Sequence, residues 1–254
     1  MKTQFLYHAE AVGASGYLTL PFQEQIEIQA SAALPINGGH GSARSENFNH
    51  RNILSFHRAE SMVIGSYSDR DKAHGTVASV VVEGVNVMNV VTCDRVVLRL
   101  TSKHDDGGSE PSFIIHGSHF DNLRIAGHPI HVDLATDLFS EMSTWSKLSQ
   151  AHAHSEKFRE EMKGLTLLQR EDNALPESKG MLGLTLARNL DRLPGGLTRN
   201  GHGIYVPHFG TVYLGEFFIS RTARRLMMLH VDLGCAVEGC GGIGSGEGNG
   251  TSWP

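Results

Sequence analysis

The stretch GTVASVVVEGVNVMNVVTCDRVVLRL, residues 75–100, decides the fold class of this chain. Residues 76–82 are rich in β-branched side chains, which favours a well-buried strand. Residues 96–101 continue as a second strand, because side chains on alternate positions face opposite sides and Arg99 falls on the outward side. Between the two, the Glu-Gly pair at residues 83–84 predicts that the first strand ends.

The same kind of reading predicts strands along most of the chain. Further strands are expected in residues 25–30, 52–67, 113–115, 123–125, 212–214 and 227–233. Residues 25–30 alternate apolar with polar side chains, as a half-buried strand does. Residues 52–67 divide into two short strands around residues 57–60, and residues 220–223 supply the turn of the last hairpin.

One segment changes its period from two to between three and four. The apolar residues that recur at this spacing are Leu134, Leu138, Phe139, Met142, Trp145 and Leu148. They share one face of a helix, so the sequence predicts a single helical insertion at about residues 133–163, with Asp133 as its N-cap.

Together these patterns predict a mainly β fold, an antiparallel β-sandwich or barrel with one helical insertion. We expect residues 1–233 to form a single β-rich domain. Residues 234–254 are dominated by glycine and are expected to form a flexible tail.

Composition limits the classes of function. The chain has 254 residues, with 22 Lys and Arg against 27 Asp and Glu, a formal net charge of -5. There is no basic field to attract nucleic acid. Apolar runs are too short for a membrane-spanning helix or a signal peptide, which predicts a soluble, cytoplasmic protein.

Three cysteines, Cys93, Cys235 and Cys240, are too few for a disulfide scaffold and fit a reducing compartment. Cys235 and Cys240 lie in a glycine-rich stretch that is able to close into a disulfide on oxidation or to give two thiolates to a metal. Free thiols are the preferred interpretation, because no second paired-cysteine motif completes a zinc site.

Histidine is the one unusual functional residue type, with 15 copies. Two pairs at spacing three offer candidate metal ligands, His116 with His119 and His128 with His131. Imidazole is a common ligand of transition metals. Positions i and i+3 of a strand point to opposite faces, so a shared ion requires a bend within each pair. Surface or hydrogen-bonded histidines are the simpler interpretation.

Two segments, VEGVNVMNVVTCDRV at residues 82–96 and GSHFDNLRIAGHPI at residues 117–130, resemble the repeating layout of bacterial β-sandwich surface proteins called choice-of-anchor P. The resemblance implies a non-enzymatic β module and brings no catalytic residues with it. We expect the chain to differ from those proteins in lacking an export signal and a carboxy-terminal membrane anchor.

The leading functional hypothesis is therefore a non-enzymatic structural or binding module. Sheet edges must be covered, so self-association into an oligomer or fibre is expected. The alternative is a metal-dependent β-barrel enzyme that uses the histidine cluster and a transition metal as cofactor. A ligand-binding barrel without chemistry is a third hypothesis, which the sequence does not separate from the first.

Overall fold

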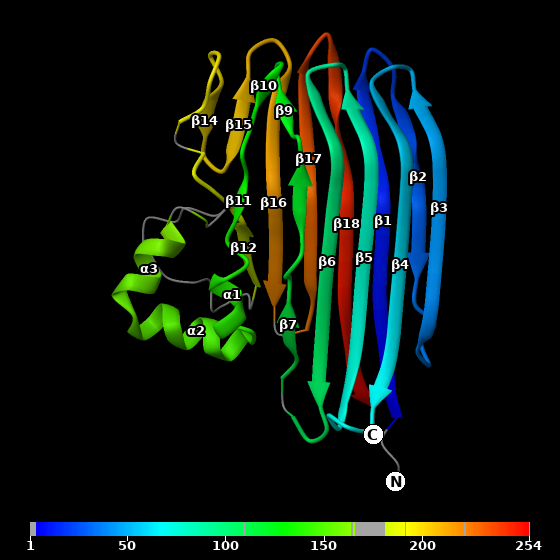
Figure 1. Ribbon diagram of the computed structural model, residues 1–254, viewed down its shortest axis with the longest axis vertical. Helices are drawn as coiled ribbons and strands as arrows, with labels where there is room; N and C mark the ends of the chain where they lie inside the picture. Colours follow the sequence, from blue (N-terminus) through cyan, green and yellow to red (C-terminus); the bar gives the residue numbers. More distant parts are fainter. Residues whose placement is uncertain are drawn as a thin grey trace.

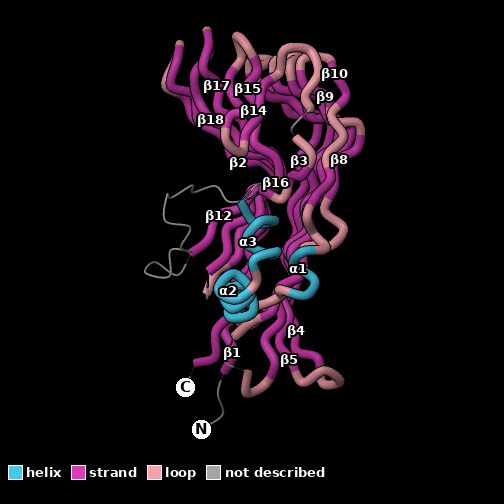
Figure 2. The backbone as a smooth tube through the Cα atoms, turned by 90° about the vertical axis from the view of Figure 1, so that its left-hand side faces the viewer, coloured by secondary structure: helices cyan, strands magenta, loops and turns pink. Residues whose placement is uncertain are grey.

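Two antiparallel sheets packed face to face form the body of the protein (Figures 1 and 2). The computed structural model describes residues 4–108, 110–163, 165, 181–190, 192–220 and 222–253. The described strands form separate sheets, so the mainly β prediction is confirmed as a sandwich and not as a closed barrel. Both chain termini lie at one end of the sandwich, here called the terminal end, and the other is called the far end.

The first sheet, sheet A, contains both the beginning and the end of the chain. In spatial order its strands are β14 (Thr198–Asn200), β15 (Gly203–Val206), β16 (Gly210–Ser220), β17 (Arg224–Cys235), β18 (Val237–Trp253), β1 (Gln4–Leu20) and β2 (Glu24–Ala33), and β12 (Met181–Thr185) also pairs with β16. The predicted last hairpin corresponds to β16 and β17.

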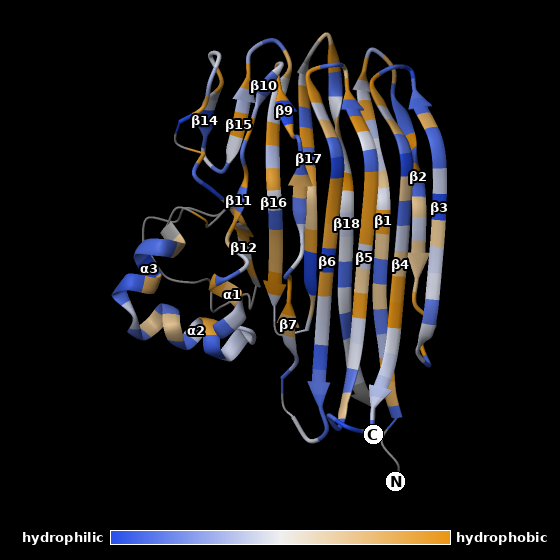
Figure 3. Ribbon diagram, in the orientation of Figure 1, coloured by the Kyte–Doolittle hydropathy of each residue, from blue (hydrophilic) through white to orange (hydrophobic). Residues whose placement is uncertain are grey.

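The second sheet, sheet B, is a meander built on four long strands. In spatial order its strands are β10 (His128–Pro129), β9 (Arg124–Ile125), β6 (Val91–Asp105), β5 (Ala73–Val87), β4 (Leu54–Ser68) and β3 (Gly39–His50), and the short strands β7 (Ser112–Ile114) and β8 (His119–Asp121) also pair with β6. Strand β3 forms one edge and is hydrophilic to neutral along most of its length (Figure 3).

The expected single helix is instead a group of three short helices. They are α1 (Leu138–Glu141), α2 (Trp145–His154) and α3 (Glu156–Lys163). Thr144 and Ser155 have extended backbones, and their side-chain oxygens accept hydrogen bonds from the backbone N–H groups of Lys147 and Phe158, each at 3.2 Å. These caps start a new helix at each point. Asp133 is no helix cap, since it belongs to β11 (Asp133–Leu134), which pairs with β13 (Ala187–Arg188).

The apolar face predicted for the helix is nevertheless packed on the core, with Phe139, Trp145 and Leu148 buried. The ring of Phe139 in α1 packs against those of Phe113 of sheet B and Phe217 of sheet A, with centroids 6.0 and 5.6 Å away. The helices lie beside one side of the sandwich (Figure 2). Within the described part of the chain, no helix is long and apolar enough to cross a membrane.

Two predicted strand breaks are local interruptions of the ladder inside continuous strands. The Glu-Gly pair at 83–84 does not end a strand, because β5 and β6 pair in one register on both sides of Gly84, which has a φ of +68°. The two short strands expected in residues 52–67 are one strand, β4, whose register with β5 is the same on both sides of His57. The buried positions change from even to odd numbers here, from 56 to 59 in β4 and from 82 to 85 in β5, so each strand continues with its faces exchanged.

The prediction of a flexible tail at residues 234–254 is wrong. Most of these residues, Val237–Trp253, form β18, which pairs with β17 on one side and β1 on the other, so it is a central strand of sheet A. Glycines replace side chains where the two sheets approach: a Cβ built at Gly246 would lie 2.7 Å from Leu98 Cδ2. The composition typical of a linker is here a consequence of close packing between sheets.

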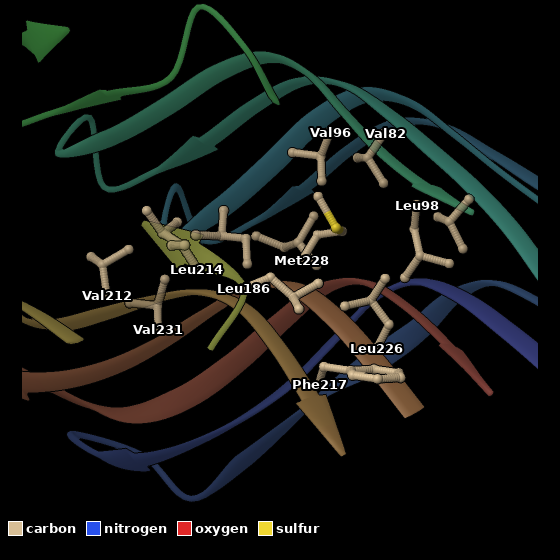
Figure 4. Close-up of a cluster of buried hydrophobic side chains, with 14 of the residues drawn as sticks. Val82, Val96, Leu98, Leu186, Val212, Leu214, Phe217, Leu226, Met228 and Val231 are labelled. Atoms are coloured by element: carbon tan, nitrogen blue, oxygen red, sulfur yellow. The ribbon is translucent and has the colours of Figure 1, made fainter. Parts of the chain in front are cut away.

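Side chains from both sheets meet in the core. Val82, Val96 and Leu98 of sheet B face Phe217, Leu226 and Met228 of sheet A (Figure 4). Towards the terminal end the inward positions become polar, as Thr76 pairs with Ser102 and His74 with His104 across β5 and β6. The hydroxyl oxygens of Thr76 and Ser102 are buried and lack a hydrogen-bond partner among the described residues.

Candidate functional site

The histidines predicted as metal ligands, His116, His119, His128 and His131, do not converge. His119 lies opposite Val97 of β6, whereas the β9–β10 hairpin that holds His128 meets β6 at Val91. These two points are six residues apart on one strand, about 20 Å at the usual rise. Among the described residues, no group of three or more His, Cys, Asp or Glu side chains is arranged to hold a metal ion.

These histidines are surface residues. His116, His119 and His131 are exposed, and His128 is half-buried. His119 Nδ1 lies 2.9 Å from the carbonyl oxygen of Gly117, and its Nε2 lies 3.7 Å from Asp121 Oδ2. The simpler interpretation, surface or hydrogen-bonded histidines, fits this arrangement.

A different pair of histidines flanks a buried carboxylate on the outer face of sheet A. Glu216 of β16 has a side chain only 9 % exposed. Its Oε2 lies 2.8 Å from His230 Nδ1, on the neighbouring strand β17, and its Oε1 lies 3.5 Å from His202 Nε2, in the turn between β14 and β15. Three consecutive elements of the sheet therefore converge on one carboxylate.

The network extends from Glu216 towards solvent. His230 Nε2 lies 3.1 Å from Asp232 Oδ1, and the Asp232 side chain is 49 % exposed. The ring of Tyr213 lies between the two imidazoles, with its centroid 4.8 Å from that of His202 and 5.1 Å from that of His230. We call Glu216, His202, His230, Asp232 and Tyr213 the outer-face network.

The charges of the network are mutually dependent. Burial raises the pKa of Glu216, but hydrogen bonds and positive charge from His202 and His230 outweigh it and hold that pKa at about 2. The hydrogen bond to Glu216 raises the pKa of His230, although burial opposes it. Both ring nitrogens of His230 face a carboxylate, so its protonated form donates one hydrogen bond to Glu216 and one to Asp232.

This arrangement fixes the orientation of Asp232. A buried ion pair contributes little net stability, because desolvation offsets much of the attraction. Its clearest effect here is positional: Glu216 holds the His230 ring, and the ring holds one oxygen of Asp232. Burial raises the pKa of Tyr213, and a side-chain hydrogen bond between Tyr213 and Asp232 adds to this increase, so two neighbours hold the Asp232 carboxylate.

A pocket adjoins Asp232. It has a volume of about 380 Å³ and is lined by Tyr205, His208, Phe209, Thr211 and Asp232, among others. Tyr205, Thr211 and Asp232 are cross-strand partners on β15, β16 and β17, so they form one row on the outer face. The Tyr205 side chain is 44 % exposed. We call this hollow the Asp232 pocket.

A local irregularity of β16 places Glu216 in the network. Val212 and Leu214 point into the core, and regular alternation would send Glu216 inwards with them. Gly215 has a φ of +65°, and the pairing of β16 with β17 skips this residue. Beyond Gly215 the strand continues in the same register with its faces exchanged, so that Phe217 takes the inward position and Glu216 the outward one.

Part of this site could be predicted from the sequence. His230 and Asp232 alternate with the apolar residues of a predicted strand, which puts both on its polar face. Their pairing with Glu216 and His202 depends on the order of strands in sheet A and on the exchange of faces at Gly215. Sequence reasoning therefore missed the network and selected histidines by their spacing.

The cysteines take no part in this site. Cys93 is buried, and burial raises the pKa of its thiol to about 11, whereas Cys240 is an exposed free thiol on β18. The side chain of Cys235 lies outside the described part of the structure.

The fold and the outer face define the class of this protein, an antiparallel β-sandwich with a polar network beside a surface pocket. The chain belongs to a family described as a domain of unknown function, DUF8256, whose model matches residues 5–220. No curated protein and no solved structure matches the chain. The family match covers β1 to β16, and Glu216 falls within it.

Proposed function

We propose that this chain is a non-enzymatic binding module that holds a carbohydrate in the Asp232 pocket. The observation that carries the proposal is the oriented carboxylate of Asp232 beside the exposed ring of Tyr205, in one row of sheet A. Such a volume is in the range of small-ligand sites.

The chemistry of the pocket matches that of a sugar. A pyranose ring has an apolar face, which packs on an aromatic ring, and hydroxyl groups that donate to a carboxylate. Tyr205 offers the aromatic surface, and Asp232 offers a charged acceptor. His208 and Thr211 add polar groups on the remaining sides.

Binding is favoured over glycoside hydrolysis. Hydrolysis of a glycosidic bond by paired carboxyl groups needs a general acid whose pKa is raised, so that it carries a proton near neutral pH. The pKa of Glu216 is instead lowered to about 2, and its oxygens accept hydrogen bonds from two histidines. Its role in the proposal is to position His230 and, through it, Asp232.

The proposal is tested by screening the labelled protein against a glycan array and measuring the affinity of each hit by calorimetry. Tyr205→Ala is expected to weaken binding by about ten- to hundredfold, since it removes the aromatic surface. Tyr17→Ala is the matched control, because Tyr17 is a similarly exposed tyrosine at 42 % outside the pocket. Absence of any glycan hit, or equal effects of the two variants, would refute the proposal.

We also propose that the protein self-associates, as expected from its sheets. The outer face of sheet B is a better candidate for the contact between copies than the edge strand of that sheet. Edge strand β3 carries the charged pair Arg44 and Glu46 and a left-handed residue, Asn47, at which its ladder with β4 is interrupted, features that discourage edge pairing. On the face, Met62, Ile64 and Ile114 are exposed.

The two exposed residues Ile64 and Ile114 belong to one cross-strand row that runs through Val77 and Thr101. Light scattering at high concentration tests the proposal. We expect a dimer or larger species that Ile64→Lys converts to monomer, with Ile28→Lys, an exposed isoleucine of sheet A, as the control. A monodisperse monomer of the unmodified protein would refute it.

A further inference from the structure

The far end of the sandwich contains a second, chemically different cleft. It has a volume of about 400 Å³ and lies between turns of both sheets, with Leu18, Phe22, Ile53, Met88 and Val237 among its apolar walls. Phe22 is 59 % exposed and Leu20, nearby in sequence, 49 %. Large apolar side chains at such exposure, beside an open cleft, mark a binding site for an apolar group.

The cleft continues towards the core. A smaller apolar cavity of about 20 Å³ lies between the sheets and shares Leu18 and Ile53 with the cleft. These two side chains therefore line both the cleft and the cavity.

Two strained turns form the lip of the cleft. The turns after β3 and β5 have left-handed residues at both central positions, Arg51 and Asn52 in one and Met88 and Asn89 in the other, with φ between +51° and +57°. Asn or Gly is favoured at both positions of such turns. Arg and Met are costly there, and strain of this kind concentrates at ligand sites.

The polar groups at the lip are hydrogen-bond donors. The Oδ1 atoms of Asn52 and Asn89 already accept from Asn49 and Asn86, at 2.9 and 2.8 Å, so each amide has its Nδ2 donor to offer. Arg51 adds a guanidinium whose side chain is 57 % exposed. Its Nε lies 2.7 Å from Glu24 Oε2 and its Nη2 lies 3.4 Å from Glu24 Oε1, whereas Nη1 takes no part in this ion pair. The guanidinium carbon lies 5.5 Å from the ring centroid of Phe22.

We propose that this cleft binds a long-chain carboxylate, with the hydrocarbon chain between Leu18, Ile53 and Met88 and the carboxylate on Arg51. A carboxylate accepts hydrogen bonds and donates none, which matches a lip made of donors. Arg51 is able to hold it while Nε keeps its bond to Glu24. The flexible side chain of Met88 adapts to the shape of an alkyl chain.

The test is titration of dodecanoate into the protein, followed by calorimetry, with dodecanol as the neutral probe of equal chain length. Dodecanoate is expected to bind more tightly than dodecanol. Arg51→Gln is expected to weaken dodecanoate about tenfold or more and to leave dodecanol unchanged, since it removes a charge-assisted hydrogen bond. Arg44→Gln is the matched control, an exposed and ion-paired arginine on β3 outside the cleft.

A second variant distinguishes a loss of binding from a loss of folding. Met88→Asn places a favoured residue in the left-handed turn, so the temperature of thermal unfolding is expected to stay or rise. The apolar wall is shortened at the same time, so both probes are expected to bind more weakly. Equal binding of the two probes with no effect of Arg51→Gln would overturn the carboxylate assignment, and no binding of either probe would overturn the site.

Discussion

Replacement of Gly246 by alanine tests whether the glycine-rich end of the chain is packed as the structure has it. The new Cβ would lie 2.7 Å from Leu98 Cδ2 and 3.3 Å from Ala78 Cβ. Both neighbours are fully buried, so neither can move away freely. Overpacking of this kind costs about 1–3 kcal/mol.

The unfolded state gives a smaller effect of opposite sign. Loss of glycine freedom in the unfolded chain stabilises the variant by about 0.4–1 kcal/mol. The expected net destabilisation is therefore about 1–2 kcal/mol, or about 2–8 °C in the melting temperature of a chain of this size.

Denaturant unfolding followed by circular dichroism measures this difference. Gly241→Ala is the matched control on the same strand, because its Cβ would meet nothing closer than the Ser15 carbonyl oxygen at 3.7 Å. This control shares the unfolded-state effect and lacks the clash. If Gly246→Ala is as stable as Gly241→Ala, β18 does not pack against sheet B as described.

Three further predictions concern titration, buried hydroxyls and thiols. The contribution of the Glu216–His230 pair to stability should be largest between pH 4.5 and 6.5, the ordinary pKa values of the two groups. It should be lost as the pH falls through about 2, where Glu216 is protonated, and as the pH rises through the raised pKa of His230. Urea unfolding of Glu216→Gln and the unmodified protein across pH 2–9 checks this, and a constant difference would contradict it. Thr76→Val should be neutral or stabilising by up to about 1–3 kcal/mol, since it removes a buried hydroxyl that has no partner among the described residues; a clear loss in thermal unfolding would show that the hydroxyl is bonded. Cys240 should react with a thiol reagent far faster than buried Cys93, and peptide mapping by mass spectrometry that finds equal labelling would contradict the burial of Cys93.

The sequence predicted the elements of this protein better than their extent. Alternation found the β16–β17 hairpin and much of β5 and β6, because burial of one face imposes a period of two. The strand ends were misjudged at Gly84 and His57, where the ladder is interrupted and the faces exchange without ending the strand. Glycine at 244, 246, 248 and 250 alternates with Ser, Glu and Asn, a period-two signal that composition alone concealed.

Which residues come together in the candidate sites depends instead on the tertiary structure. By itself, the sequence determined a mainly β chain with an apolar helical face and a polar side to β17, since these depend on neighbours within one element. The partnership of Glu216 with His202 and His230 depends on three elements meeting in sheet A and on the exchange of faces at Gly215. The separation of His119 from His128 along β6 likewise depends on strand register, which residue spacing does not encode.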